Sequence, residues 1–133
     1  MTSVRRIVLD TNVLVSALIS PGGPPGRILD LVLSGEIILV LDDRILSEYS
    51  KVLSREKLGF DPDDVKQLIL FIRLNAESIS AKPVKKQLPD PGDQPFLEVA
   101  RAAACDSIVT GNLRHFPKVK EAISPRDFIE QMQ

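Results

Sequence analysis

The fold is decided by the stretch Arg6-Ile7-Val8-Leu9-Asp10-Thr11-Asn12, in which an apolar run ends abruptly at a carboxylate. Residues 7–9 have the continuous hydrophobicity of a strand that is buried on both faces of a parallel sheet. Ligands of open α/β sheets bind just beyond the carboxyl ends of the strands, where Asp10 is expected to lie. Comparable positions later in the chain carry three more polar residues, Glu48, Asp93 and Asn112. Together these residues predict a metal site.

Length and composition limit the class of protein. The chain has 133 residues, of which 44% are hydrophobic, and no change in composition marks a second unit. We therefore expect a single domain over residues 1–133. The 17 basic and 18 acidic residues give a net charge of -1, so the overall balance indicates neither a nucleic-acid nor a membrane partner. A polyanion would have to be met by local positive charge or by a metal ion.

Neither a targeting segment nor a disulfide framework is predicted. The apolar residues 7–19 follow two arginines, but Asp10 and Asn12 interrupt them and no Ala-x-Ala cleavage site follows, which argues against a signal peptide. The apolar runs are far too short to span a bilayer. Cys105 is the single cysteine, which excludes an intramolecular disulfide, and its alanine neighbours favour a core position. We expect a reducing, cytoplasmic setting and no membrane partner.

Apolar strand patterns alternate with helical patterns, which predicts an α/β protein with a parallel sheet covered on both faces. Strands are expected at residues 7–9, 37–41, 107–110 and 122–123, with a weaker candidate at 77–81. Helices are expected at 11–19, 27–34, 43–53 and 62–75. Two more helices are expected to begin after Asp93 and after Ser124, and the apolar side of the first of these extends to Ala104. Residues 20–26, rich in glycine and proline, are predicted to form neither helix nor strand, and residues 82–92 form a loop.

The four polar residues are expected to converge. Strands of a doubly wound sheet deliver their carboxyl ends to one edge, where Asp10, Asp93 and Asn112 would meet. Glu48 would join them if its helix packs tightly on the sheet. Clustered carboxylates repel one another unless a cation neutralises them, and oxygen ligands favour Mg²⁺ or Mn²⁺. Such an ion can activate water and stabilise the charge on a phosphodiester, which is nuclease chemistry.

Four motifs, taken in order, resemble the PIN domain. They are Ile7-Val8-Leu9-Asp10-Thr11-Asn12, Leu46-Ser47-Glu48-Tyr49, Asp93-Gln94-Pro95-Phe96-Leu97-Glu98-Val99-Ala100, and Ile108-Val109-Thr110-Gly111-Asn112 followed by His115-Phe116. The chain is most similar to the VapC-like toxins of bacterial and archaeal toxin–antitoxin systems. The resemblance covers nearly the whole chain, and the ordered set is far more specific than any single motif.

This resemblance implies a three-layer α/β/α sandwich with a central, mainly parallel sheet. It also implies metal-dependent cleavage of RNA, a homodimer and inhibition by a small antitoxin protein. Asp10, Glu48 and Asp93 match the family's three metal-binding acids. The fourth catalytic position, often Asp in the family, is Asn112, which lowers the charge of the site by one. Auxiliary roles are expected for nearby residues, namely Thr11, Asn12, Asp90 and Thr110.

Each candidate residue also has a purely structural interpretation. Asp10 could cap the helix that follows it, and Glu48 could be one more solvated acid on a helix. Asp93 could be only a helix cap, and Asp90 in the same turn could exchange roles with it. Asn112 beside a glycine would make a good turn. The ordered set of motifs favours the site interpretation for all four catalytic candidates.

Two other functions compete with the nuclease. Residues 9–13 superficially resemble the nucleophile loop of haloacid-dehalogenase-type phosphatases, which form an aspartyl phosphate. Asn12 stands where those enzymes need a second Asp, which argues against this alternative. The second alternative is a catalytically weak or inactive PIN-like module that binds RNA or another partner, because a fold does not fix a function.

Local positive charge is expected to hold the RNA. Five cations on segments near the predicted site are candidates for phosphate contacts, namely Arg27, Arg44, Lys51, Arg55 and Arg114. For any one of them, ordinary solvated surface is the competing interpretation. One tyrosine and no tryptophan leave little for the stacking of bases. His115 is interpreted as a packed or capping side chain rather than as a catalytic base.

Overall fold

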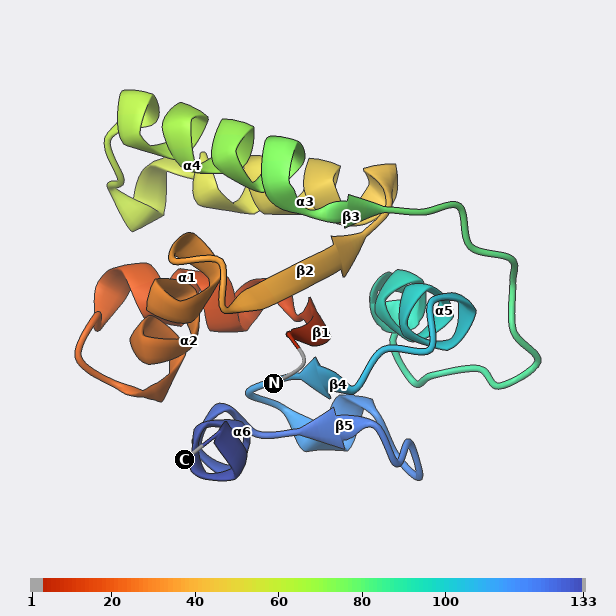
Figure 1. Cartoon of the computed structure of the whole chain (residues 1–133). Coiled ribbons are helices and arrows are strands. Elements are labelled where there is room, and N and C mark those ends of the chain that lie inside the picture. The colour runs from red at the N-terminus through yellow and green to blue at the C-terminus, as the bar shows by residue number, and fades with distance from the viewer. Residues whose placement is uncertain (1–3, 133) are drawn as a thin grey trace.

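A computed structural model describes residues 4–132, which form helices around a parallel five-stranded sheet (Figure 1). The strands are β1 (Arg5–Leu9), β2 (Ile37–Leu41), β3 (Glu77–Ser78), β4 (Ser107–Val109) and β5 (Ala122–Ile123). Their order in the sheet is β3-β2-β1-β4-β5, so successive strands are added on one side of β1 and then on the other. The boundary between β1 and β4 is therefore the switch point at which open α/β sheets bind ligands.

Helices cover both faces of this sheet. They are α1 (Thr11–Ile19), α2 (Pro24–Leu33), α3 (Asp43–Leu53), α4 (Pro62–Asn75), α5 (Gln94–Ala102) and α6 (Pro125–Met132), with short 3-10 turns η1 (Glu56–Leu58), η2 (Pro91–Asp93) and η3 (Leu113–His115). In Figure 1, α1 and α2 lie on one side of the sheet, α5 lies on the other, and α3 and α4 pack beside β2 and β3. This arrangement confirms the predicted α/β/α architecture.

The strands are apolar because both of their faces are covered. Ile7, Val8 and Leu9 of β1 are at most 1% exposed. Ile7 lies in register with Leu39 of β2 on one side and with Ser107 of β4 on the other. Burial on both faces selects a continuous hydrophobic run rather than an alternating one. This is why the sequence pattern identified the three inner strands.

Several helix boundaries coincide with residues that favour capping. Asp42 precedes α3 and accepts a hydrogen bond from the Ile45 N–H at 3.1 Å. Asp61 precedes α4 and accepts one from the Asp63 N–H at 2.8 Å. Gly35 follows α2 with a φ of +82°, a conformation that glycine adopts without a steric penalty. These local signals could be read directly from the sequence.

The prediction that residues 20–26 form no helix is wrong for the last three residues. The helix α2 begins at Pro24, because a proline in the first turn loses no intrahelical hydrogen bond. Gly26 in this turn is buried against the backbone of Pro21. A Cβ atom at position 26 would lie 1.9 Å from the Pro21 carbonyl oxygen. The glycine therefore permits the close approach that folds α2 back on α1.

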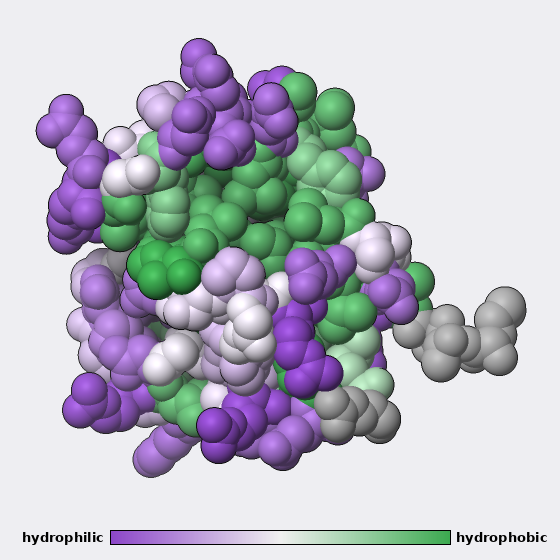
Figure 2. All heavy atoms as spheres, turned by 90° about the vertical axis from the view of Figure 1, so that its left-hand side faces the viewer, coloured by the Kyte–Doolittle hydropathy of each residue, from purple (hydrophilic) through white to green (hydrophobic). Residues whose placement is uncertain are grey.

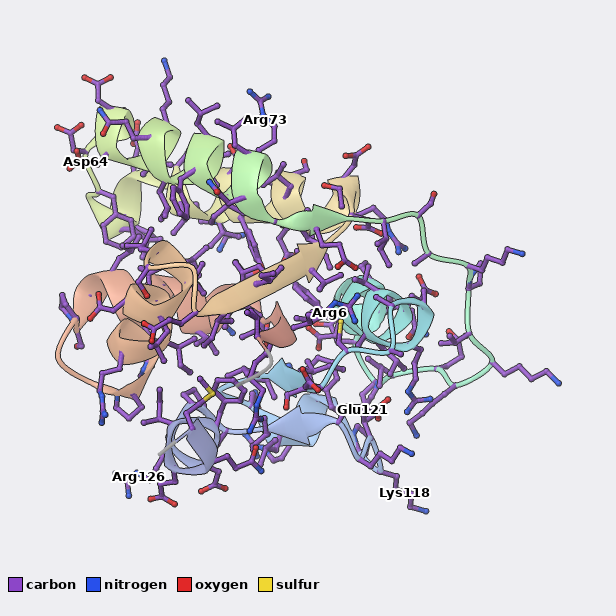
Figure 3. All side chains as sticks on the ribbon, in the orientation of Figure 1. Arg6, Asp64, Arg73, Lys118, Glu121 and Arg126 are labelled. Atoms are coloured by element: carbon purple, nitrogen blue, oxygen red, sulfur yellow. The ribbon has the colours of Figure 1, made fainter. Side chains whose placement is uncertain are left out.

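Two predicted elements are shorter in the structure. The strand expected at residues 77–81 is limited to Glu77 and Ser78, and α5 ends at Ala102 before the expected apolar side is complete. Ala104 is exposed and has a φ of +50°. Arg6 of β1 lies beside this end of α5 (Figure 3), where it donates to the Ala103 carbonyl oxygen at 2.9 Å and also pairs with Glu77. This long-range contact satisfies the helix end, and no local pattern could predict it.

One side of the molecule carries exposed apolar side chains. Figure 2 looks at the side on the left of Figure 1, and a hydrophobic area with polar surroundings occupies much of its upper half. Ile19 and Leu33 are 60% and 46% exposed. A cavity of about 290 Å³ lies between α1, α2 and α4 and is lined by Leu18, Leu33 and Leu68 among others. Within residues 4–132, no helix has both the length and the apolar character needed to cross a membrane.

Candidate active site

Asp10 lies directly after β1, at the carboxyl edge of the sheet. Its backbone N–H donates to the Val109 carbonyl oxygen at 2.9 Å, which continues the pairing of β1 with β4. The side chain makes no capping hydrogen bond to α1, although Asp10 precedes that helix. Instead, Asp10 Oδ2 accepts a hydrogen bond from the Thr110 hydroxyl at 2.7 Å. Asp10 is 5% exposed, so it is a buried carboxylate and not a side-chain helix cap.

Thr110 joins Asp10 to the turn after β4. Its side chain is fully buried, and its hydroxyl donates to Asp10 while it accepts the Asn112 N–H at 3.0 Å. The side-chain nitrogen of Asn112 lies 2.9 Å from His115 Nε2. One hydroxyl therefore fixes the carboxylate of one strand end relative to the turn that follows the neighbouring strand.

Glu48 reaches the site from α3. Its Oε2 accepts a hydrogen bond from the hydroxyl of Thr11, the first residue of α1. The adjacent Tyr49 is fully buried and donates its hydroxyl hydrogen bond to the Leu9 carbonyl oxygen. Burial, with the negative charges of Asp10 and Glu48, raises the pKa of Tyr49, so the phenol remains a donor. These bonds show that α3 packs as tightly as the sequence argument required.

Asp93 and His115 meet at the start of α5. Asp93 is 9% exposed, and its side chain does not cap the helix. Asp93 Oδ2 lies 3.1 Å from His115 Nδ1, but the ring N–H does not point at the oxygen, and this buried oxygen has no hydrogen-bond partner among the described residues. The sequence interpretation had placed His115 outside the site. Its position one 3-10 turn after Asn112 was the available signal.

Burial and mutual repulsion raise the pKa values of two of these acids. Burial is the main reason that the pKa of Asp93 rises to about 6, and the charge of Asp10 adds to the effect. Burial also raises the pKa of Asp10, as does the charge of Glu48, while the hydrogen bond from Thr110 acts in the opposite direction. The fold thus holds together negative charges that a cation would stabilise.

The acids fit a divalent cation in their chemistry. Carboxylate oxygens of Asp10, Glu48 and Asp93 are the donors that Mg²⁺ and Mn²⁺ prefer. Because buried carboxylate oxygens normally have a partner, the unpaired Asp93 Oδ2 favours an additional ligand at this point. Over residues 4–132, no group of three His, Cys, Asp or Glu side chains already stands at the spacing of a complete metal site. The carboxylates would therefore have to move together to surround an ion.

Arg44 forms a second charged group beside the acids. It pairs with Asp42 at 2.7 Å and with Glu98 at 2.8 Å, and both carboxylates are less than 9% exposed. The sequence analysis did not single out Glu98, because a glutamate within a helix gives no sign of its burial. Arg44 was predicted to contact phosphate, and in the structure it already has two carboxylate partners. It connects α3 and α5, the helices that position Glu48 and Asp93.

The auxiliary candidates around the acids take different positions. Asn12 is exposed on the first turn of α1. Asp90 is exposed and accepts the Gly92 N–H at 2.8 Å, so it shapes the turn that leads to Asp93. Its charge also contributes to the raised pKa of Asp93. The structure thus gives the buried position to Asp93 and the turn position to Asp90.

The remaining predicted RNA contacts are not gathered at the acids. Arg114 is exposed in η3, between Asn112 and His115. Lys51 lies in the last turn of α3, three residues or about 4.5 Å along the helix from Glu48, and Arg55 follows the end of this helix. Arg27 is exposed on α2 beside a cavity that it shares with α6. Arg44 and Lys51 lie on α3, the helix that carries Glu48, and Arg114 lies in η3 between Asn112 and His115.

Fold and site together define an α/β domain with buried acids at the switch point of a parallel sheet. A family model described as PIN domain matches residues 6–114. The chain therefore belongs to the PIN domain family, whose members are generally nucleases, and the predicted family is confirmed.

Two comparisons with individual proteins agree with this assignment. The chain is 35% identical over 126 residues to the uncharacterized protein MJ1680 of Methanocaldococcus jannaschii, which covers 92% of this chain and 76% of that protein. Its fold is similar to a chain in the crystal structure of VapBC2 from Rickettsia felis bound to a DNA fragment from their promoter. The TM-score is 0.60 at 17% identity, over 90% of this chain and 97% of that chain.

Proposed function

We propose that the protein is a metal-dependent endoribonuclease that cleaves single-stranded RNA and acts as the toxin of a toxin–antitoxin pair. Asp10 and Asp93 are buried acids whose pKa values are raised by burial and by the neighbouring negative charges, including that of Glu48, and Asp93 Oδ2 is unpaired; these observations carry the proposal. Neither Asp10 nor Asp93 uses its side chain to cap a helix, so the structural interpretation does not account for them. Mg²⁺ or Mn²⁺ held by these three acids would supply activation of water and stabilisation of phosphodiester charge.

The side chains of the site would position the ion and the attacking water and accept a proton from that water. Asp10 directly follows a rigid strand, and Thr110 orients its carboxylate. We therefore propose that Asp10 is the metal ligand whose position is held most firmly. Glu48 is oriented by Thr11 and would help to hold the attacking water. Asp93 would take the proton from this water at its carboxylate. Asn112 would orient the water by hydrogen bonding.

Single-stranded RNA would be held by local charge, because the net charge of the chain is only -1. Arg114 is the proposed phosphate contact nearest the acids. Arg44 could share this role only if it leaves its carboxylate partners. Lys51 lies within one turn of Glu48 on α3 and is also proposed to contact phosphate near the acids. Arg27 and Arg55 would contact only RNA that extends well beyond the cleavage point. We therefore expect a modest dependence of RNA affinity on salt.

The proposed partners are a small antitoxin and a second copy of the chain. The exposed apolar side chains around Ile19 and Leu33 support a protein partner, because surface patches of this kind are commonly covered by one (Figure 2). The VapBC2 structure with a similar fold is bound to DNA from its promoter. An RNA-cleaving toxin would act in the cytoplasm, which is the location that we propose.

Cleavage by Asp10→Asn tests the proposed activity. The purified wild type should cleave a labelled single-stranded RNA with Mg²⁺ or Mn²⁺ and lose this activity in EDTA, while duplex RNA should remain intact. Asp10→Asn keeps the shape of the side chain and should reduce cleavage by about a hundredfold or more. Asp127→Asn, at an exposed position in α6, is the matched control and should remain active.

The same experiment identifies the competing function. A folded wild type that binds RNA without cleaving it would support the alternative of an inactive RNA-binding module. Full metal-dependent activity in Asp10→Asn would show that Asp10 has a structural role only, and the proposed site would then be wrong.

A further inference from the structure

We propose that His115 is a ligand of the divalent ion at this site, and that its imidazole makes the site prefer Mn²⁺ to Mg²⁺. The inference rests on the proposed function, because it requires that the acids hold a divalent ion. It adds a nitrogen donor to a site that the sequence predicted to be made of oxygen donors only.

His115 and Asp93 are arranged as two ligands of one ion would be. His115 Nδ1 and Asp93 Oδ2 are 3.1 Å apart, yet the ring N–H does not point at the oxygen. Two donors that each lie about 2.1 Å from one ion, at right angles, are about 3 Å apart. The observed separation matches that expected for two ligands of one ion, and the N–H is not aligned with the oxygen as in an ordinary hydrogen bond. Asp93 is 9% exposed, so solvent does not readily satisfy its unpaired oxygen.

The other ring nitrogen of His115 also has a suitable partner. A histidine that binds a metal usually donates its second N–H to an oxygen, which fixes the tautomer and the ring orientation. His115 Nε2 lies 2.9 Å from the side-chain amide of Asn112. A half-turn of this amide exchanges its nitrogen and oxygen with almost no change in shape. Asn112 Oδ1 then accepts the Nε2–H, and the lone pair of Nδ1 is available to the ion.

His115 is held by the same residues that orient Asp10. The Thr110 hydroxyl donates to Asp10 and accepts the Asn112 N–H, and the Asn112 side chain contacts His115. Phe116, the next residue, is 2% exposed and anchors the end of η3 in the core. The imidazole is thus placed by the fold and not by a free loop, while its partial exposure leaves it accessible to an ion.

An imidazole in this position affects which ion is bound. Mg²⁺ is a hard cation that prefers oxygen ligands and retains its waters, whereas Mn²⁺ accepts imidazole nitrogen as well as carboxylate oxygen. Because the imidazole is neutral, it also supplies less charge to attract either ion than a carboxylate ligand would. Both effects weaken Mg²⁺ binding, and the nitrogen ligand offsets the loss for Mn²⁺.

Pulsed electron paramagnetic resonance of bound Mn²⁺ tests the contact directly. His115 is the only histidine in the chain, so a tag-free preparation should show nitrogen-14 coupling from one imidazole and from no other source. His115→Asp should abolish this coupling. Calorimetry should show that the ratio of Mn²⁺ to Mg²⁺ affinity falls about tenfold or more in His115→Asp. Leu113→Ala, at an exposed position in the same 3-10 turn, should change neither result.

The outcomes separate this inference from the proposed function. In one outcome, the wild type binds Mn²⁺ without nitrogen coupling, while Asp10→Asn loses this binding. That result would overturn the role of His115 and leave the nuclease proposal intact. An unchanged affinity ratio in His115→Asp would also overturn it. Absence of any Mn²⁺ binding to the wild type would overturn both proposals. The wild-type spectrum decides the contact even if the variant fails to fold.

Discussion

Thr110 donates a hydrogen bond of 2.7 Å to Asp10, a residue 100 positions earlier in the chain. The two residues follow β4 and β1, which pair in parallel, so the bond lies just beyond the ends of two adjacent strands. The same hydroxyl accepts the N–H of Asn112. A single buried side chain therefore orients the central carboxylate and the turn that carries the rest of the site.

Removal of the Thr110 hydroxyl should weaken both the fold and the site. Thr110→Val is nearly isosteric but leaves a buried carboxylate oxygen and a backbone N–H without a partner, which should lower the free energy of unfolding by about 1 to 3 kcal/mol. Urea denaturation measures this loss, and calorimetry with Mn²⁺ should show weaker binding. Thr110→Ser retains the hydroxyl and should lose much less of either quantity. Equal losses in the two variants would show that the methyl group, not the hydroxyl, is what matters.

The raised pKa of Asp93 should make the stability of the metal-free protein depend on pH. The folded state holds a proton on Asp93 up to a pH of about 6, whereas the unfolded chain releases it near its ordinary pKa. The native state thus binds more protons in this window, so the contribution of Asp93 to stability falls as pH rises from about 4 through about 6. Asp93→Asn should match the wild type at pH 4 and exceed it by about 1 kcal/mol above pH 6, allowing for solvent screening.

Urea denaturation in EDTA across this pH range measures the effect of Asp93. Asp127→Asn, which removes an exposed acid, should show no such pH-dependent difference from the wild type. Saturating Mn²⁺ should reverse the order of stability at pH 7, because an ion that binds only the native state stabilises the wild type. A difference between Asp93→Asn and the wild type that stays constant with pH would contradict the assignment.

Arg44 is expected to stabilise the packing of α3 on α5 more than it holds RNA. Arg44→Met would leave Asp42 and Glu98 buried without their cation, at a cost of about 1 to 3 kcal/mol in urea denaturation. Adding Glu98→Gln to this variant should recover part of the loss, because the buried charge is then removed. RNA affinity should change less in Arg44→Met than in Arg114→Met. The opposite order of affinities would restore Arg44 as a phosphate contact.

Gly26 should be intolerant of any side chain. In Gly26→Ala the new Cβ would overlap the backbone of Pro21, which cannot move without shifting the connection between α1 and α2. We expect a loss of about 2 kcal/mol or more in the free energy of unfolding. Gly22→Ala in the same connection meets no atom within 4 Å and is the matched control. Similar thermal unfolding temperatures for the two variants would show that the connection adapts.

The accuracy of the sequence analysis depended on the range of the interactions involved. The inner strands and the helix starts at Asp42 and Asp61 were predicted correctly, because burial on both faces and capping leave marks within a few residues. The start of α2 was predicted too late, because prolines that usually break a helix are tolerated in its first turn. Just beyond the end of α5, the Ala103 carbonyl oxygen accepts a hydrogen bond from Arg6, about 100 residues away, and this partner had no local sign.

The sequence by itself determined the α/β class, the family and the four catalytic candidates. Hydrophobic periodicity and the order of motifs can be recognised along the chain without knowledge of the three-dimensional structure. Only the tertiary structure decided that Asp10 is buried beside Thr110, that Asp93 keeps an unpaired oxygen, and that His115 lies next to it. It also gave Arg44 two carboxylate partners in place of an open position for phosphate. The reason is physical: burial, pKa and pairing depend on distances between side chains that packing brings together from remote parts of the chain, and no local pattern records those distances.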